Sequence, residues 1–182
     1  MKFQPIDVIL KNQSTVTIRM CQIEDAEEII QTVKIYLLDS EFIPLEADEF
    51  NPTIEQEKEF IQSFIDNDNS LLLVAIYKGQ IIGNIDLTGS QRKALKHTAV
   101  VGMGILKEWR NSGLGTALIH SAIDWTKHNS VLEKLILHVF STNEAGIMIY
   151  KKAGFIVEGV QKNLIKIDDN CYVDSFLMGL EV

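Results

Sequence analysis

The chain has 182 residues and a formal net charge of -8 at pH 7, from 17 basic and 25 acidic side chains. This length suits one domain with a substantial core, so we expect a single domain over 1–182, with a core over 16–182 and an N-terminal strand extension over 1–15. The acidic balance opposes a surface that covers nucleic-acid phosphates and favours cationic small partners, and the lack of a long apolar run opposes membrane insertion and favours a cytoplasmic protein.

The first predicted elements are a hairpin and a helix. Two short β-type runs, 6–10 and 16–20, flank the turn-prone residues 11–14 and predict an opening hairpin. Acidic residues within 24–28 are followed by apolar residues at helical spacing, which predicts a helix that ends near Leu38.

An acidic loop and a second helix are expected next. The segment 39–51 contains Pro44 and several large apolar residues, which favours a loop with apolar anchors, and loops of this size are often functional. Thr53 and Gln56 then have the spacing of a capping box, which predicts an amphipathic helix. The run Asp-Asn-Asp-Asn at 66–69 is expected to end that helix.

The middle of the chain has β character. Near-continuous apolar runs at 71–77 and 81–87 predict a hairpin that is buried on both faces. A further strand is expected over 98–106. Gly102 and Gly104 lie inside that strand, where a glycine marks either a bulge or the close approach of another group to the backbone.

A glycine-rich corner follows this strand. Residues 110–115 read R-N-S-G-L-G, and the apolar stripe that begins at Leu114 predicts a helix to about Trp125. Two glycines at a helix start leave backbone N–H groups uncovered where they lack intrahelical partners, so the corner suits a phosphate. The corner has no lysine followed by Ser or Thr after its last glycine, which argues against a P-loop nucleotide enzyme.

The remaining elements are a strand, a helix and a closing hairpin. A strand is expected over 135–140, and Ser-Thr-Asn-Glu at 141–144 predicts a capping box at the start of a helix. Gly154 is expected to end that helix. Strands over 155–166 and 171–180 complete the order, which predicts a mixed sheet flanked by helices.

These residues together resemble the GCN5-related N-acetyltransferase (GNAT) superfamily, from about Val16 to the C-terminus. Its signature, Q/R-x-x-G-x-G/A between a strand and a helix, is matched by Arg110–Gly115. Further similarities are Thr17-Ile18-Arg19 with Glu24-Asp25-Ala26, Asn143 with Tyr150 seven residues later, Lys152-Ala153-Gly154-Phe155, and Tyr172-Val173-Asp174 with Met178. The resemblance implies an α/β (α+β) fold, in which a mixed, mostly antiparallel sheet of about seven strands is flanked by about four helices.

The resemblance also implies acetyl-CoA as co-substrate and no metal, with the pyrophosphate on backbone N–H groups of the corner and the pantetheine arm along the strand before it. The implied cofactor-binding residues are Met103, Gly104, Ile105, Arg110, Asn111, Ser112, Gly113, Leu114, Gly115, Thr116, Asn143 and Tyr150. Arg110 has an alternative reading as a surface arginine, because the motif relies on main-chain atoms. Cys21 and Cys171 stand outside any metal-ligand spacing and are interpreted as inert thiols.

The implied reaction is direct attack of an amine on the thioester, which needs a base and an acid. An alkyl amine with a pKa of about 10.4 costs about 4.6 kcal/mol to deprotonate at pH 7. His138 lies five residues before Asn143 and is the candidate base, with a satisfied histidine of the sheet as the alternative. Tyr150 matches the superfamily's general acid, although proton transfer from a phenol to a thiolate is uphill by about 2 kcal/mol at reference values.

The acceptor is left open as a primary amine of a small molecule or of a peptide or protein N-terminus. Segments 39–51 and 88–97 and the last hairpin turn are expected to line its site. Asp86 and Asp174 either orient an amine or pair with neighbouring groups, and the acidic residues of 39–51 either attract a cation or form a solvated face. A non-catalytic acetyl-CoA-binding or interaction module is the alternative function, and a homodimer is possible.

Overall fold

One eight-stranded sheet organises the computed structural model, which describes residues 2–182 and leaves Met1 of the predicted extension outside. The strand order is β1-β2-β3-β4-β5-β6-β8-β7, and β5 and β6 form the one parallel pair of the described sheet. The strands are β1 (Ile6–Ile9), β2 (Thr15–Met20), β3 (Leu71–Tyr77), β4 (Gln80–Gly89), β5 (Thr98–Ile105), β6 (Lys134–Phe140), β7 (Ile156–Asp168) and β8 (Cys171–Glu181). The predicted mixed, mostly antiparallel sheet is confirmed, with eight strands instead of about seven because β1 pairs with β2.

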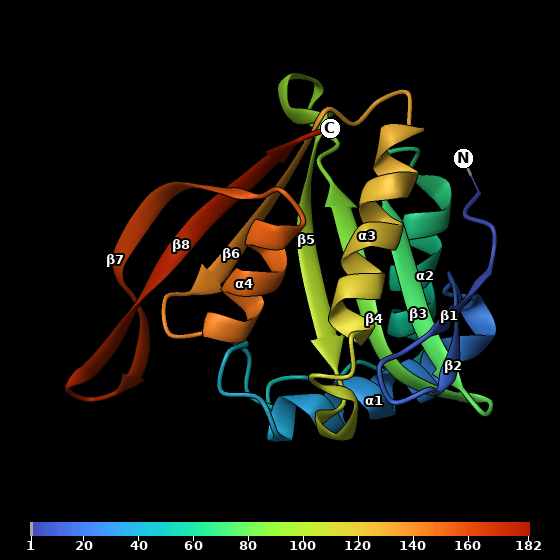
Figure 1. Ribbon diagram of the computed structural model, residues 1–182, viewed down its shortest axis with the longest axis horizontal. Coiled ribbons are helices and arrows are strands. Elements are labelled where there is room, and N and C mark those ends of the chain that lie inside the picture. Colours follow the sequence, from blue (N-terminus) through green and yellow to red (C-terminus); the bar gives the residue numbers. More distant parts are fainter. Residues whose placement is uncertain (1) are drawn as a thin grey trace.

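Helices cover both faces of this sheet. The helices are α1 (Ala26–Leu38), α2 (Ile54–Asp66), α3 (Leu114–Lys127) and α4 (Glu144–Lys152), with short 3-10 turns η1 (Ile23–Asp25), η2 (Lys93–Leu95) and η3 (Lys107–Trp109). In Figure 1, α3 and α4 lie in front of the sheet and α1 and α2 lie behind it, while β7 and β8 extend as a long hairpin to one side. Because both faces are covered, β3 and β4 are buried almost throughout, as their apolar sequences predict.

The helix ends follow the capping signals, with one exception. Thr53 caps α2 as predicted: its Oγ1 accepts from Gln56 N at 3.2 Å, and its N–H donates to Gln56 Oε1 at 2.8 Å. Gly154 ends α4 in the left-handed conformation, with φ +101°. The predicted capping box at 141–144 is wrong, since Asn143 itself is the N-cap and its Oδ1 accepts from Gly146 N at 2.9 Å. The Asn143 side chain lies three residues before the amide that it caps, whereas Ser141 lies five residues before that amide.

The parallel pair β5–β6 separates after a short stretch. The ladder consists of Thr98 with Lys134, Ala99 with Leu135, and Val100 with Ile136. Beyond Val100 the two strands diverge, while β6 stays paired with β8 over its whole length. Backbone groups of residues 101–105 on this edge therefore face a gap instead of a neighbouring strand, in the middle of the sheet (Figure 1).

Candidate active site

The glycine-rich corner lies at the carboxyl end of β5, beside this gap. Asn111 and Gly113 both have left-handed backbones, with φ of 62° and 96°. Ser112 Oγ donates to Trp109 O at 2.6 Å and accepts from Leu114 N at 3.3 Å, so the side chain fixes the turn. The N–H groups of Gly115 and Thr116 belong to the first turn of α3, where the helix supplies no acceptor for them. These donors, at the positive end of a 14-residue helix, fit a phosphate group as the sequence predicts.

Lys11 is a neighbour of this corner that the sequence does not reveal. It lies in the turn between β1 and β2, and its N–H donates to Ser112 O at 2.9 Å. The aliphatic part of its side chain passes Gly113, where an added Cβ would lie 3.6 Å from Lys11 Cγ. The turn of the first hairpin therefore brings a cation to the rim of the phosphate-binding corner, about a hundred residues away in sequence.

Arg110 uses its side chain within the chain. Its Nε donates to Ile105 O at 3.1 Å, and its NH1 donates to Asp39 O at 3.0 Å. The guanidinium thus joins the end of β5 to the end of α1. Its side chain is therefore not a free surface arginine, and its contacts hold the corner in place.

The strand glycines allow close approach, and the bulge alternative is wrong. The register between β4 and β5 runs without a shift from Gly83–Ile105 to Gly89–Ala99. A Cβ at Gly104 would overlap the ring of Tyr36 from α1, and a Cβ at Gly102 would overlap the carboxylate of Asp86 from β4. The two glycines therefore make room for a tyrosine and an acid on the α1 face of the sheet.

Asp86 and Tyr150 are two buried titratable groups whose acidity is strongly altered. Burial raises the pKa of the Asp86 carboxyl to about 6, although Thr88 Oγ1 donates to its Oδ2 at 3.0 Å and opposes the shift. Burial raises the pKa of Tyr150 to about 12, and the charge of Asp86 adds to this effect. The carboxylate from β4 and the phenol from α4 thus lie within electrostatic reach of each other, although they come from opposite faces of the sheet.

Tyr36 and Asn84 complete this polar cluster. Burial raises the pKa of Tyr36, the Asp86 charge raises it further, and a hydrogen bond with Asn84 lowers it. Asn84 is 7% exposed, and its Oδ1 is a buried acceptor with no partner among the described residues. An orphaned buried acceptor costs free energy unless a ligand or water satisfies it.

His138 and Asp174, the other candidates for proton transfer or amine binding, lie in different surroundings. His138 is exposed on β6, with Nδ1 3.0 Å from Gln161 Oε1 of β7. Asp174 accepts from Lys162 Nζ at 2.7 Å and from Asn163 N at 2.9 Å, and these contacts lower its pKa. Both pair with the β7–β8 hairpin, so the structure favours the structural alternative for each of them.

A pocket of about 350 Å³ opens on the α1 and α2 side of the cluster. Its polar floor includes Tyr36, Asn84 and Asp86, and Glu57 of α2 also borders it. The apolar lining comes from both helices, the connecting loop and β3, and comprises Ile29, Val33, Leu37, Ile43, Leu45, Phe50, Pro52, Phe60 and Leu72. The loop 39–51 thus lines this pocket, whereas the lining takes no residue from 88–97 or from the last hairpin turn, the other two segments that are expected to line the acceptor site.

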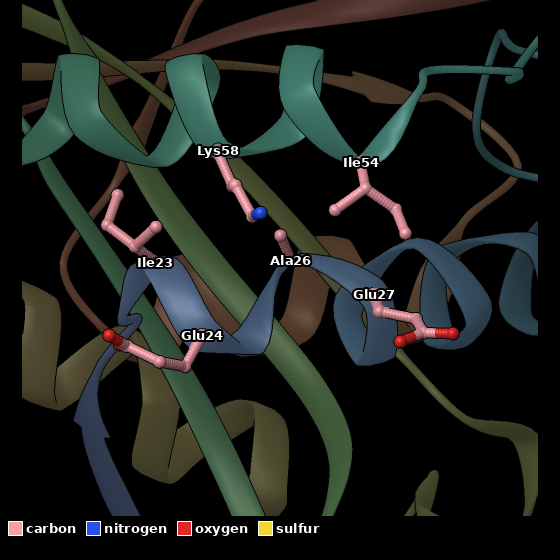
Figure 2. A pocket seen from close by; sticks show the side chains of 6 residues that line it. All are labelled: Ile23, Glu24, Ala26, Glu27, Ile54 and Lys58. Atoms are coloured by element: carbon pink, nitrogen blue, oxygen red, sulfur yellow. The ribbon is translucent and has the colours of Figure 1, made fainter.

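A second hollow lies between the start of α1 and α2 and has a different character. It is lined by Ile23, Glu24, Ala26, Glu27, Ile54 and Lys58. Figure 2 shows Lys58 pointing between the two helices while the carboxylates of Glu24 and Glu27 point away from it. Its lining shares no residue with the polar cluster, so this hollow is not the candidate active site.

Within residues 2–182, no group of three or more His, Cys, Asp and Glu side chains is arranged to hold a metal ion. Both cysteines are free: Cys21 is buried, which raises the pKa of its thiol, and Cys171 is exposed. No helix in the described part of the chain is long and apolar enough to cross a membrane.

Comparisons with known proteins agree with this geometry. The sequence model of the Acetyltransferase (GNAT) family matches residues 34–155. The L-amino acid N-acetyltransferase AaaT of Escherichia coli is 31% identical over 106 residues, which cover 58% of this chain and 65% of that protein. The chain thus spans less than two thirds of this curated relative.

Solved structures extend the likeness to most of the chain. An acetyltransferase of GNAT family from Streptococcus pneumoniae is similar with a TM-score of 0.89 and 31% identity, over 92% of this chain and 99% of that one. The protein yncA from Salmonella typhimurium, solved with its cofactor acetyl-CoA, has a TM-score of 0.79 and 17% identity, over 92% of this chain and 94% of that one. The second likeness shows the fold alone.

Proposed function

Because the chain belongs to the acetyltransferase (GNAT) family, we propose that it transfers the acetyl group of acetyl-CoA to a primary amine of a small molecule. One observation carries this proposal: a buried carboxylate and a buried phenol with raised pKa values lie within electrostatic reach of each other, in a fold whose β5 edge is open beyond Val100 and whose α3 begins with N–H donors that lack helical partners. The name of the Escherichia coli relative and the acetyl-CoA in the Salmonella typhimurium structure support the same reaction class.

The chain's own donors fit acetyl-CoA. The N–H groups from Asn111 to Thr116 hold the pyrophosphate, and the Lys11 ammonium adds a counter-charge at the rim. On the unpaired edge of β5, the main-chain groups of Met103 and the N–H of Ile105 are left to form hydrogen bonds with the pantetheine arm, since Ile105 O already accepts from Arg110 Nε, and Gly104 between them gives the arm room to approach. Asn143 uses its Oδ1 to cap α4, so its amide Nδ2 is the donor left for the same arm.

Asp86 acts as the general base in this proposal, in place of the predicted His138. Its pKa of about 6 leaves it ionised at pH 7. The same value makes it a stronger base than a solvated aspartate by about 2 pKa units. The amine nitrogen forms the bond to the acetyl carbonyl carbon, its proton passes to the Asp86 carboxylate, and the C–S bond breaks.

Tyr150 serves the departing sulfur. Full proton transfer from a phenol of pKa about 12 to a thiolate of pKa about 8.5 is uphill by about 5 kcal/mol, more than reference values give. The raised pKa keeps the phenol protonated at every working pH. Tyr150 therefore stabilises the developing thiolate first by a hydrogen bond, and the proton follows as the product leaves.

Release of free CoA from acetyl-CoA across a panel of small amines, amino acids and N-terminal peptides tests the proposal. We expect thiol release that depends on both the amine and the protein, with an acetylated amine identified by mass spectrometry. Acetyl-CoA binding without turnover on any acceptor would instead support the non-catalytic module. The cytoplasmic location and the homodimer stay predictions.

A further inference from the structure

The pocket of about 350 Å³ above Asp86 indicates which amines this chain accepts, an inference that rests on the proposed function. From its lining we propose that the acceptor is a small primary amine on an aromatic or branched aliphatic body, without a carboxylate next to the amine. The substrate class follows from three properties of the pocket: its apolar walls, its set of hydrogen-bond acceptors and its lack of cationic side chains.

The apolar walls select the body of the acceptor. Ile29, Val33 and Leu37 come from three successive turns of one face of α1, and Phe50 and Phe60 face them from the loop and from α2. A volume of about 350 Å³ lies at the small end of ligand pockets and suits one ring or a branched chain. Apart from Gln56 of α2 and the residues of the polar floor, the side chains that line the pocket are apolar, so a polyamine or a peptide would leave most of its own polar groups unsatisfied there.

The polar floor selects the amine. Asn84 belongs to the pocket lining, and its Oδ1 is a buried acceptor without a partner among the described residues; the Asp86 carboxylate lies on the same strand two residues away. Glu57, 5% exposed, adds a carboxyl whose pKa is raised by burial. A protonated or neutral amine supplies N–H donors for these oxygens, whereas a hydroxyl or a thioether would leave part of them unsatisfied.

The charge around the pocket disfavours a carboxylate. No lysine, arginine or histidine belongs to its described lining, and the segment 39–53 contains five acidic residues and no basic one. The two cations beside this segment are engaged: Lys107 Nζ lies 3.7 Å from Asp39 Oδ1, and Arg110 donates to Asp39 O. An α-carboxylate would thus lie near Asp86 and Glu57 without a counter-ion, which costs binding free energy.

Matched acceptors test this inference. We expect kcat/KM for 2-phenylethylamine to exceed that for L-phenylalanine by at least about tenfold, with L-phenylalaninamide close to the amine, because the amide restores bulk without charge. Ethylamine should be a poorer acceptor than 2-phenylethylamine, since it leaves the apolar walls uncovered.

A paired substitution separates charge from bulk. Leu45→Arg places a cation on the pocket wall, at a side chain that is already 37% exposed. It should lower the ratio of kcat/KM for 2-phenylethylamine to kcat/KM for L-phenylalanine at least about fivefold. Leu38→Arg, outside the lining and 78% exposed, makes the same chemical change as a control and should leave the preference unchanged. Thermal melting of both variants verifies that they fold.

The outcomes distinguish the two levels of the proposal. Equal or better use of L-phenylalanine by the unmodified protein would overturn the acceptor class and leave acetyl transfer intact. Acetyl-CoA binding measured by calorimetry, with no thiol release on any amine, would overturn the proposed function and the acceptor class with it.

Discussion

The Asp86 carboxylate occupies the space that a side chain at residue 102 would need. The two residues face each other across the β4–β5 ladder, and a Cβ at Gly102 would overlap Asp86 Oδ1. The Asp86 carboxylate can therefore take this position only because residue 102 is a glycine. Gly104, two residues along β5, makes room in the same way for the aromatic ring of Tyr36 from α1.

Gly102→Ala tests this relationship. The added methyl displaces the carboxylate from this position, so we expect kcat to fall at least about tenfold while acetyl-CoA affinity changes little, since misplaced catalytic groups lose rate. Gly159→Ala is the matched control, because it is also a strand glycine but has no atom within 4 Å of an added Cβ. Steady-state kinetics on both variants would contradict the arrangement if they gave the same kcat.

Asp86→Asn is expected to stabilise the protein at neutral pH. The folded pKa of about 6 lies above the ordinary value of 3.8, so stability falls as the pH rises through this window, and the ionised group costs at most about 3 kcal/mol above it. The variant avoids that cost, and its advantage in urea unfolding at pH 7.5 should disappear near pH 4.

Asp174→Asn should behave in the opposite way. Lys162 and Asn163 lower the pKa of Asp174, so its contribution to stability is present above the unfolded pKa and is lost on acidification. Removing this charge costs stability at pH 7.5. If Asp86→Asn were also less stable than the unmodified protein at pH 7.5, the ionised Asp86 carboxylate would stabilise the fold, which would contradict the cost expected from its raised pKa.

Tyr150→Phe should lower turnover at least about tenfold while acetyl-CoA still binds. The hydroxyl acts on the departing sulfur, and the ring packing against Phe155, with centroids 5.9 Å apart, is kept in the variant. Because burial raises the pKa of Tyr150 to about 12, the unmodified protein should show no loss of kcat between pH 8 and 10 from this group. A near-normal rate in the variant would remove the tyrosine from the mechanism.

Lys11→Ala should weaken acetyl-CoA binding about three- to tenfold without a change in kcat. The lysine lies beside Gly113, and the loss should shrink at high salt because charge pairs at a surface are screened. Lys127→Ala, at the other end of α3, is the control. Calorimetric titration at two salt concentrations measures both, and equal effects of the two substitutions would argue against a phosphate contact for Lys11.

Local signals predicted the corner and most elements, whereas the altered acidity of Asp86 and the position of Lys11 depend on long-range contacts. The glycine corner depends on φ angles and helix-end donors that neighbouring residues dictate, so residues 110–116 were identified from sequence. Asp86 acquires its raised pKa only through burial in the folded chain, and the apolar run at 81–87 in which it lies does not tell how deeply its carboxylate is enclosed. Lys11 reaches the corner through the hairpin turn, and His138 has the right intrinsic chemistry but an exposed position next to Gln161.

The pH dependence of CoA release by Asp86→Asn and His138→Gln tests the central claim most directly. We expect kcat/KM of His138→Gln to stay within about threefold of the unmodified protein. Its pH profile should still fall on the acid side near pH 6, because Asp86 becomes protonated there. We expect Asp86→Asn to lose at least about 100-fold in kcat/KM and to lack that fall near pH 6. A near-normal rate for Asp86→Asn, or the absence of that fall in His138→Gln, would contradict the assignment of Asp86 as the base.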